Sequence, residues 1–226
     1  MKLNQVRPVA KLSAEEQAAN SLREFILSGA IKPGTRLTEI ALADQMGVAR
    51  ATLRTGLHRL AGEGIVVQIP YTGWQVAALS AEDVWELWTL RGSLESLAAK
   101  LVAESKDPSV REAIEDAYED LLAACKKGKM AKISESDFAL HRAVIALSGH
   151  SRLARQYKLV EQQVKLFIAT SNTLTVECPE DIVAQHKPMI DAILSGNAKK
   201  AAQEAWSHNE TEGQRLVTWI NSHKLS

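Results

Sequence analysis

The chain contains 226 residues, of which 46% are hydrophobic and 24% are charged, a composition that supports a packed core and excludes disorder as the main state. Its 27 basic and 27 acidic residues cancel, but they are unevenly distributed: residues 1–78 carry nine Lys or Arg against six Asp or Glu, and residues 79–226 carry eighteen against twenty-one. We therefore expect the basic amino-terminal part to meet an anionic partner and the acidic remainder to do something else.

Hydropathy argues against export and membrane insertion. Residues 1–5 lack the apolar core of a signal peptide, and no apolar run approaches the ~18 residues that a transmembrane helix needs. Two cysteines, Cys125 and Cys178, are too few for a disulfide framework. The sequence predicts a cytoplasmic protein that makes no membrane contact.

Residues 1–77 predict a winged helix-turn-helix domain. Ser13 and Glu16 form a capping box at the start of a first helix, which Gly29 ends. Shorter helices are expected over residues 38–46 and 49–62. Two strands, near 65–69 and 74–76, flank a turn and complete the wing.

The helix expected over residues 49–62 has the character of a DNA-recognition helix. Arg50, Arg54 and His58 follow one another at intervals of four and therefore share a face. Arginine suits this position because its planar guanidinium binds phosphate or the guanine edge with two hydrogen bonds. The alternative is an ordinary solvated helix face. DNA binding is favoured over it because a short helix precedes this helix and a predicted wing follows it.

The spacing of motifs here resembles the GntR family of bacterial transcription regulators. The resemblance covers residues 13–77 and rests on residues 31–37, Met46-Gly47-Val48-Ala49-Arg50, Leu53-Arg54, Glu63-Gly64 and Gly73. It implies that the operator is contacted by the recognition helix and the wing, with candidates Arg50, Thr52, Arg54, His58, Thr72 and Gly73. Ala49 and Thr55 stand where the family usually has Ser and Glu, a departure that concerns operator preference.

Residues 78–226 predict an all-α bundle. Breaks at Gly, Pro and polar positions separate six expected helices, over about 80–104, 108–128, 131–148, 151–171, the region around His186 up to Gly196, and from there to about 222. The predicted fold class is therefore mainly α, a winged helix-turn-helix followed by a bundle of six or seven helices.

Four side chains in this bundle form a candidate metal site. Asp137 and His141 are spaced i, i+4 on one helix, and His186 and His208 lie on two helices joined by a turn. One carboxylate and three imidazoles suit zinc, with nickel, manganese or iron as alternatives, and leave a coordination position open. Considered one at a time, each histidine is more simply explained as a satisfied surface or core residue of its helix, and it is their arrangement together that favours a metal.

The same residues resemble the FCD subgroup of GntR regulators, whose all-helical effector domain often binds a divalent metal through an Asp and three His. The resemblance covers most of residues 80–215 and includes Arg91 and Glu95 in the first bundle helix. It implies an effector-binding role for Arg91, for which an internal salt bridge to Glu95 is an equally good explanation. His150 is expected to cap a helix, and Pro188 to kink the helix of His186 or start a new turn.

Together these observations predict a transcription regulator, most simply a repressor, and not an enzyme. It is expected to bind a near-palindromic double-stranded operator as a homodimer and to respond to a small carboxylate effector held at the metal site. Two alternatives share the same four ligands: a sensor whose effector is the ion itself, and a metal-dependent hydrolase. The hydrolase is disfavoured because no separate general base is apparent and the basic head would be unexplained.

Overall fold

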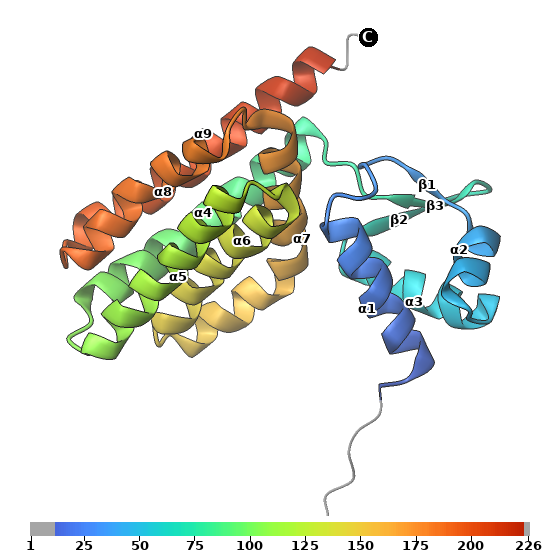
Figure 1. Ribbon diagram of the computed structural model, residues 1–226, viewed down its shortest axis with the longest axis horizontal. Helices are drawn as coiled ribbons and strands as arrows, with labels where there is room; N and C mark the ends of the chain where they lie inside the picture. Colours follow the sequence, from blue (N-terminus) through green and yellow to red (C-terminus); the bar gives the residue numbers. More distant parts are fainter. Residues whose placement is uncertain (1–11, 224–226) are drawn as a thin grey trace, which may run out of the picture.

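A computed structural model describes residues 12–223 of the chain, which form a small mixed head and a helical bundle (Figure 1). The head contains α1 (Ala14–Leu27), β1 (Arg36–Leu37), α2 (Glu39–Met46), α3 (Arg50–Gly62), β2 (Val66–Ile69) and β3 (Gly73–Val76). The bundle contains α4 (Ala81–Glu104), α5 (Pro108–Lys127), α6 (Met130–Leu147), α7 (Ser151–Thr175), α8 (Pro179–Leu194) and α9 (Ala198–His223). The predicted fold class is confirmed, with six helices in the bundle.

Local sequence signals set where the helices begin and end. Ser13 and Ser80 each form a complete capping box at the start of α1 and α4. Gly47 and Gly128 end α2 and α5 in the left-handed conformation, which glycine adopts without strain. His150 caps α7, as expected, by accepting a hydrogen bond from the backbone N–H of Leu153 at 3.2 Å.

The wing contains one more strand than the sequence predicted. Its antiparallel order is β1-β3-β2, with Val66 opposite Val76 and Ile69 opposite Gly73. The additional strand, β1, has only two residues and pairs Leu37 with Trp74. Two residues are too few for a period-two pattern to be recognised.

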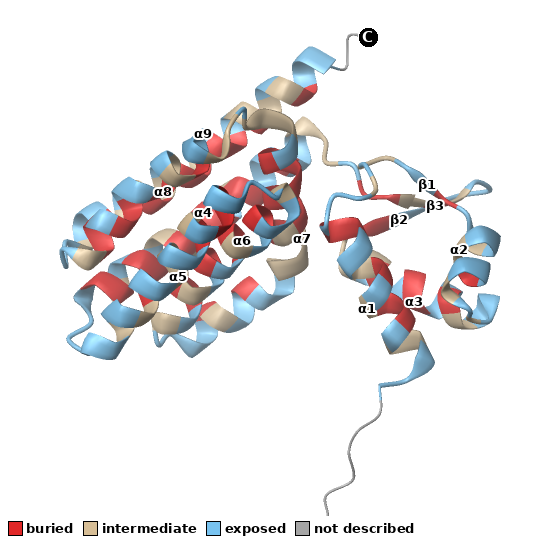
Figure 2. Cartoon of the chain, viewed as in Figure 1, coloured by how far each residue is buried: buried red, intermediate tan, exposed pale blue. Residues whose placement is uncertain are grey.

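Two hydrophobic clusters contain nearly all the buried apolar side chains of the described residues (Figure 2). One fills the bundle and the other fills the head, where Leu57, Leu60 and Trp74 are at most 1% exposed. Leu166 of α7 belongs to the head cluster, so the bundle contributes directly to the head's core. Residues 77–80, between the two clusters, adopt no regular structure.

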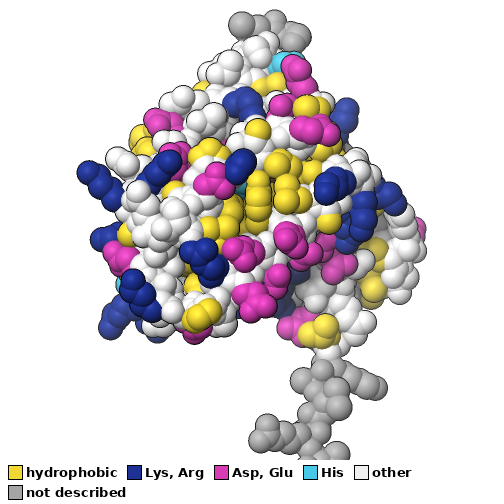
Figure 3. Space-filling view, turned by 60° about the vertical axis from the view of Figure 1, so that its left-hand side comes forward, with side chains coloured by type: hydrophobic (Ala, Val, Ile, Leu, Met, Phe, Trp, Pro, Cys, Tyr) yellow, Lys and Arg dark blue, Asp and Glu magenta, His cyan; other side chains and the backbone are white. Residues whose placement is uncertain are grey.

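Charged and hydrophobic side chains share the surface of the molecule. Acidic and basic side chains are interspersed around a central group of hydrophobic side chains on the face shown in Figure 3. Among the described residues, no helix is both long and apolar enough to cross a membrane.

Close packing of α4 against α9 organises the bundle. Gly213 of α9 lies against the indole of Trp88 on α4, and a Cβ at this position would overlap the ring. Gly92 of α4 faces Trp206 of α9 in the same way, with 3.2 Å between the Cβ position and Cε3. Two glycines therefore let two tryptophans, whose ring centroids are 5.6 Å apart, fit between these helices.

Gly213→Ala is expected to lower the free energy of unfolding by about 1–3 kcal/mol, the usual cost of overpacking a core. Urea unfolding followed by circular dichroism measures this change. Gly62→Ala is the matched control, because a Cβ there meets no atom within 4 Å. Equal stability of the two variants would contradict the packing described here.

Candidate functional site

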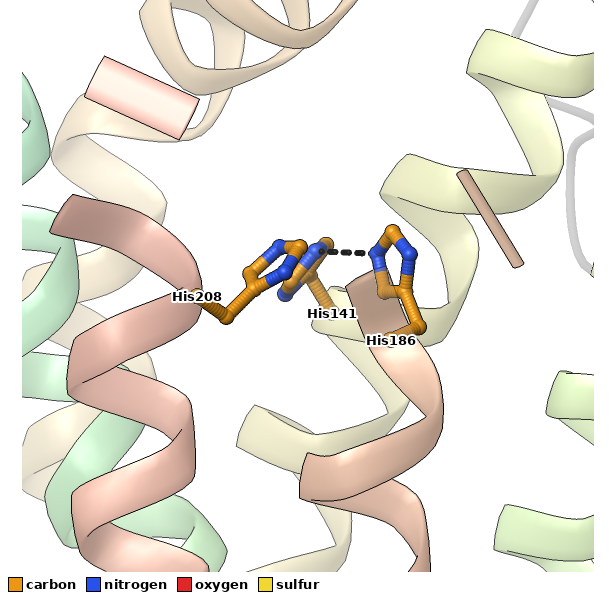
Figure 4. A group of neighbouring side chains, drawn as sticks. All are labelled: His141, His186 and His208. Carbon is orange, nitrogen blue, oxygen red and sulfur yellow. Dashed lines mark hydrogen bonds between the residues drawn. The ribbon is translucent and has the colours of Figure 1, made fainter. Parts of the chain in front are cut away.

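Three of the predicted metal ligands, His141, His186 and His208, converge inside the bundle (Figure 4), and the carboxylate of the fourth, Asp137, lies beside two of them. Asp137 and His141 come from α6, His186 from α8 and His208 from α9, and all four are at most 7% exposed. Ligand nitrogens of the three histidines lie within 4.8 Å of one another. Oδ1 of Asp137 lies 3.1 Å from Nε2 of His186 and 3.3 Å from Nε2 of His141.

Hydrogen bonds behind the rings fix which atoms face this point. Nδ1 of His186 lies 2.7 Å from the carbonyl oxygen of Ile182, which can only accept, so Nδ1 carries the proton and Nε2 has a free lone pair. Nδ1 of His141 lies 2.9 Å from Oε2 of Glu95, an ion-pair distance, which turns the Nε2 edge of this ring toward Asp137 and His186.

The carboxylate of Asp137 is oriented in the same manner. Asn172 of α7 donates a hydrogen bond to its Oδ2 at 2.7 Å, while its Oδ1 accepts none. Oδ1 therefore faces the Nε2 atoms of His141 and His186, which are 3.1 Å apart and share a hydrogen bond. Such an arrangement needs a cation or a shared proton between the acceptors.

Charges around the centre perturb two of the histidines in opposite directions. Burial by itself lowers the pKa of His141, but the charge of Glu95 together with the contacts to Asp137 and Glu95 outweighs burial and raises that pKa to about 9. Burial, followed by the charges of His186 and His141, holds the pKa of His208 well below its usual value. Neither ring nitrogen of His208 has a hydrogen-bond partner, so its neutral ring keeps a lone pair for a ligand bond.

A buried ion-pair network surrounds the centre. Arg91 of α4 donates to Glu95 at 2.9 Å and to Glu212 of α9 at 2.9 Å. Tyr157 of α7 and Asn209 of α9 each donate to Glu95 at 2.9 Å. Burial would raise the pKa of Glu95, but the charges of Arg91 and then His141 hold it well below its usual range.

The formal charges of this region do not balance without a cation. Three carboxylates, those of Glu95, Asp137 and Glu212, are at most 3% exposed, whereas Arg91 is the one arginine or lysine buried to this degree among the described residues. The proton of His141, whose pKa is raised to about 9, offsets one of the two negative charges that Arg91 leaves unbalanced. A metal that replaces this proton would meet an excess of two negative charges, which a low-dielectric interior strongly disfavours. A divalent ion matches both this excess and the donor set, so the residues fit the metal that the sequence predicted.

Arg91 is placed differently from a free effector-binding arginine. The alternative ion pair with Glu95 is present, and a second one with Glu212 accompanies it. The guanidinium also lies 5.6 Å from the centroid of the Phe167 ring. Nη2 is the one guanidinium nitrogen of Arg91 that lacks a hydrogen bond. The predicted effector contact is therefore compatible with the structure only through this nitrogen.

Several supporting residues escaped the sequence reasoning. Glu212 follows His208 by four residues, the same helical spacing that drew attention to Asp137 and His141, and could have been found from it. Asn172 and Tyr157 gave no local signal, because only tertiary packing brings α7 to the centre. Pro188 leaves α8 a continuous helix, and His186 still points at the centre.

The recognition helix exposes the two predicted arginines. Arg50 is the first residue of α3, and Arg54 lies one turn later, with 59% of its side chain exposed. Glu39 of α2 holds Arg54 through two contacts of 3.2 and 2.7 Å and also accepts a hydrogen bond from the indole of Trp74 at 2.9 Å. This acid, which the sequence reasoning missed, orients Arg54 before any DNA is bound.

The other predicted DNA-contacting residues differ in exposure and surroundings. Thr52 is half-buried, and His58 is exposed with its ring edge-on to Trp74 at 4.9 Å between centroids. Thr72 is exposed in the wing turn, and Gly73 begins β3 with a φ of 108°. Tyr71, which the sequence did not single out, is fully exposed at the tip of the wing.

Comparisons with known proteins match both parts of the chain. Residues 14–76 match the model for bacterial regulatory proteins of the gntR family, and residues 86–211 match the model for the FCD domain. The HTH-type transcriptional regulator YdhC of Bacillus subtilis is 26% identical over 88% of this chain and 89% of its own length. The gluconate operon transcriptional repressor of the same organism is 27% identical over 96% and 91%.

Solved structures share the whole fold. A GntR transcriptional regulator from Rhodococcus sp. RHA1 superposes with a TM-score of 0.76 at 22% identity, covering 91% of this chain and 98% of the other. Escherichia coli McbR superposes with a TM-score of 0.72 at 20% identity, covering 94% and 100%. At these identities the likeness establishes the architecture.

His208→Ala is expected to weaken zinc binding by at least about 10- to 100-fold, the loss that even a supporting group of a metal site causes. Competition with a chromophoric chelator measures this affinity. His150→Asn is the control, because it removes an exposed imidazole while keeping a good helix cap. Unchanged affinity in His208→Ala would contradict the four-ligand site.

Proposed function

The chain belongs to the GntR family of bacterial transcription regulators and carries an FCD domain, and we propose that it is a repressor. In this proposal, its operator affinity is set by a small carboxylic acid bound at a metal centre in the bundle. DNA binding and transcription regulation follow from the family itself. The metal, the effector and the direction of regulation are the parts proposed here. The proposal includes a cytoplasmic location, where the chromosome is accessible.

The observation that carries the metal part is the buried excess of negative charge around His141, His186 and His208. Asp137 and these three imidazoles would hold the ion, and zinc is the first candidate because nitrogen-rich sets of four suit it. A divalent ion would neutralise the site and offer an open position to a carboxylate. Asn172 and Glu95 keep the protein ligands in place whether or not an effector is bound.

Repression is proposed from two observations. Relatives that align along most of the chain include one named as an operon repressor, that of the gluconate operon. In addition, α3 already holds Arg54 oriented by Glu39, so the head needs no local folding to meet DNA.

A homodimer is proposed because the bundle exposes apolar side chains that a monomer would leave in water. Leu90 and Leu97 are spaced by seven residues on one face of α4 and are 46% and 42% exposed. Leu159 of α7 is 75% exposed. Two-fold pairing of such surfaces would present two recognition helices to the two halves of a near-palindromic operator.

Replacing both Arg50 and Arg54 by Ala is expected to weaken operator binding by about 30-fold or more, because each arginine contact is worth about 1–3 kcal/mol. Fluorescence anisotropy on operator fragments, selected from random DNA by the unaltered protein, measures the change. Arg59→Ala is the matched control, since Arg59 lies on the same helix but pairs with Glu16 at 3.0 Å. Retained affinity in the double variant would refute the assigned DNA-reading face.

The proposed role of the effector is tested by titrating this operator with the zinc-loaded protein in the presence of one organic acid at a time. An effector should change operator affinity by about 5- to 150-fold, the usual range of coupling between two sites. The effect should disappear when zinc is removed by a chelator or when His208 is replaced by Ala. A response to zinc alone, with no acid effective, would instead identify the ion as the signal, and turnover of an acid would identify a hydrolase.

A further inference from the structure

The turn at the tip of the wing holds an aromatic residue in a backbone conformation that rarely carries one. The backbone N–H of Thr72 donates to the carbonyl oxygen of Ile69 at 3.1 Å, so residues 69–72 form a β-turn. Pro70 fixes a negative φ at the second position of this turn, and Tyr71 at the third position has a φ of 61°. This is the pattern of a type II turn, whose third residue is usually Gly or Asn.

Folding alone does not account for a tyrosine at position 71. Among residues 12–223, which the structure describes, Tyr71 is the one residue other than glycine that has a positive φ. A glycine would form the same turn without strain. The Tyr71 side chain is fully exposed and adds nothing to the core of the head. Strained residues that packing does not require are concentrated at functional sites, which points to a contact made by this ring.

Contacts at the base of the wing place Tyr71 beside the DNA-reading face of α3. Trp74, three residues after Tyr71, donates to Glu39, the acid that also holds Arg54. The turn between β2 and β3 projects from the head at the end where α2 lies (Figure 1). Three residues of extended chain span up to about 10 Å. Tyr71 is therefore within reach of the minor groove that adjoins the major groove read by α3.

The hairpin formed by β2 and β3 offers DNA no positive charge. Between Arg59 and Arg91 the chain contains neither Lys nor Arg, so this hairpin has no ion pair to give a phosphate. Ile69, Pro70 and Tyr71 instead present exposed apolar surface at its tip. Proteins that bind the minor groove frequently insert apolar side chains of this kind between neighbouring base pairs.

We propose that Tyr71 contacts the operator as an uncharged aromatic wedge, which stacks against a base in the minor groove and opens one base step. Pyrimidine–purine steps such as TA and CA are the most easily unstacked, so the wing selects such a step at a fixed distance from the bases that Arg50 and Arg54 read. The contact adds affinity without releasing counterions. This inference rests on the proposed DNA-reading face of α3 and is independent of the metal and of the effector.

Tyr71→Gly separates a DNA contact from a structural role. Because relief of strain offsets the added freedom of glycine, the free energy of unfolding measured in urea should change little. Affinity for the selected operator, measured by fluorescence anisotropy, should fall by about 5- to 100-fold, the usual loss for one stacked base. The slope of log affinity against log salt concentration should stay the same, whereas Tyr71→Arg should make it steeper by about one per wing. Tyr71→Phe keeps the ring and should bind like the unaltered protein.

The opened base step is detected with 2-aminopurine, an adenine analogue that becomes brighter when it is unstacked. It is placed at one adenine after another on both sides of the bases read by α3. One position should brighten with the unaltered protein and with Tyr71→Phe, and should stay dark with Tyr71→Gly. Phe25→Ala is the matched control, an exposed aromatic residue on α1 of the same head, and should match the unaltered protein throughout.

Two results would overturn the wedge: equal operator affinity of Tyr71→Gly and the unaltered chain, or no position that brightens on binding. If binding also depends on Arg50 and Arg54, either result refutes the wing contact alone and leaves α3 as the DNA-reading element. Retained affinity in the double arginine variant would refute the DNA-reading face itself, so the two failures are distinguishable.

Discussion

The buried carboxylates of the bundle impose the constraint on which the rest of the structure depends. Glu95, Asp137 and Glu212 lie in the interior with Arg91 as their one buried cationic partner among the described residues. Burying charge is tolerable only when it is paired, so α4, α6 and α9 must pack closely enough to satisfy these groups together. The glycines at positions 92 and 213 let α4 approach α9 this closely, and the remaining negative charge is the observation that supports the proposed divalent ion.

Helix α7 physically links this centre to the head. Asn172 on α7 holds the carboxylate of Asp137, and Leu166, less than two turns earlier, is buried in the hydrophobic cluster of the head. Thr173 of the same helix lies 3.8 Å from the Cβ position of Gly29, at the end of α1. Packed side chains of α7 therefore connect Asp137 with the domain that carries Arg54.

Sequence reasoning succeeded where the signal was local or periodic. Capping boxes, glycine breaks and helical spacing placed the helices to within a few residues, and the i, i+4 spacing of Asp137 and His141 identified one edge of the centre. The two-residue strand β1 was too short to show a pattern. Glu212, the second partner of Arg91, is 121 residues away in the chain. This pairing depends on how α4 packs against α9, which a single sequence does not reveal.

The most direct test of the central claim is anomalous X-ray diffraction, at the zinc absorption edge, from crystals of the full chain grown with zinc. The account predicts one strong anomalous peak inside the bundle, at about 2.0–2.2 Å from Nε2 or Nδ1 of the three histidines and from Oδ1 of Asp137. A bundle with no peak among His141, His186 and His208, and with those imidazoles bonded only to one another, would contradict it.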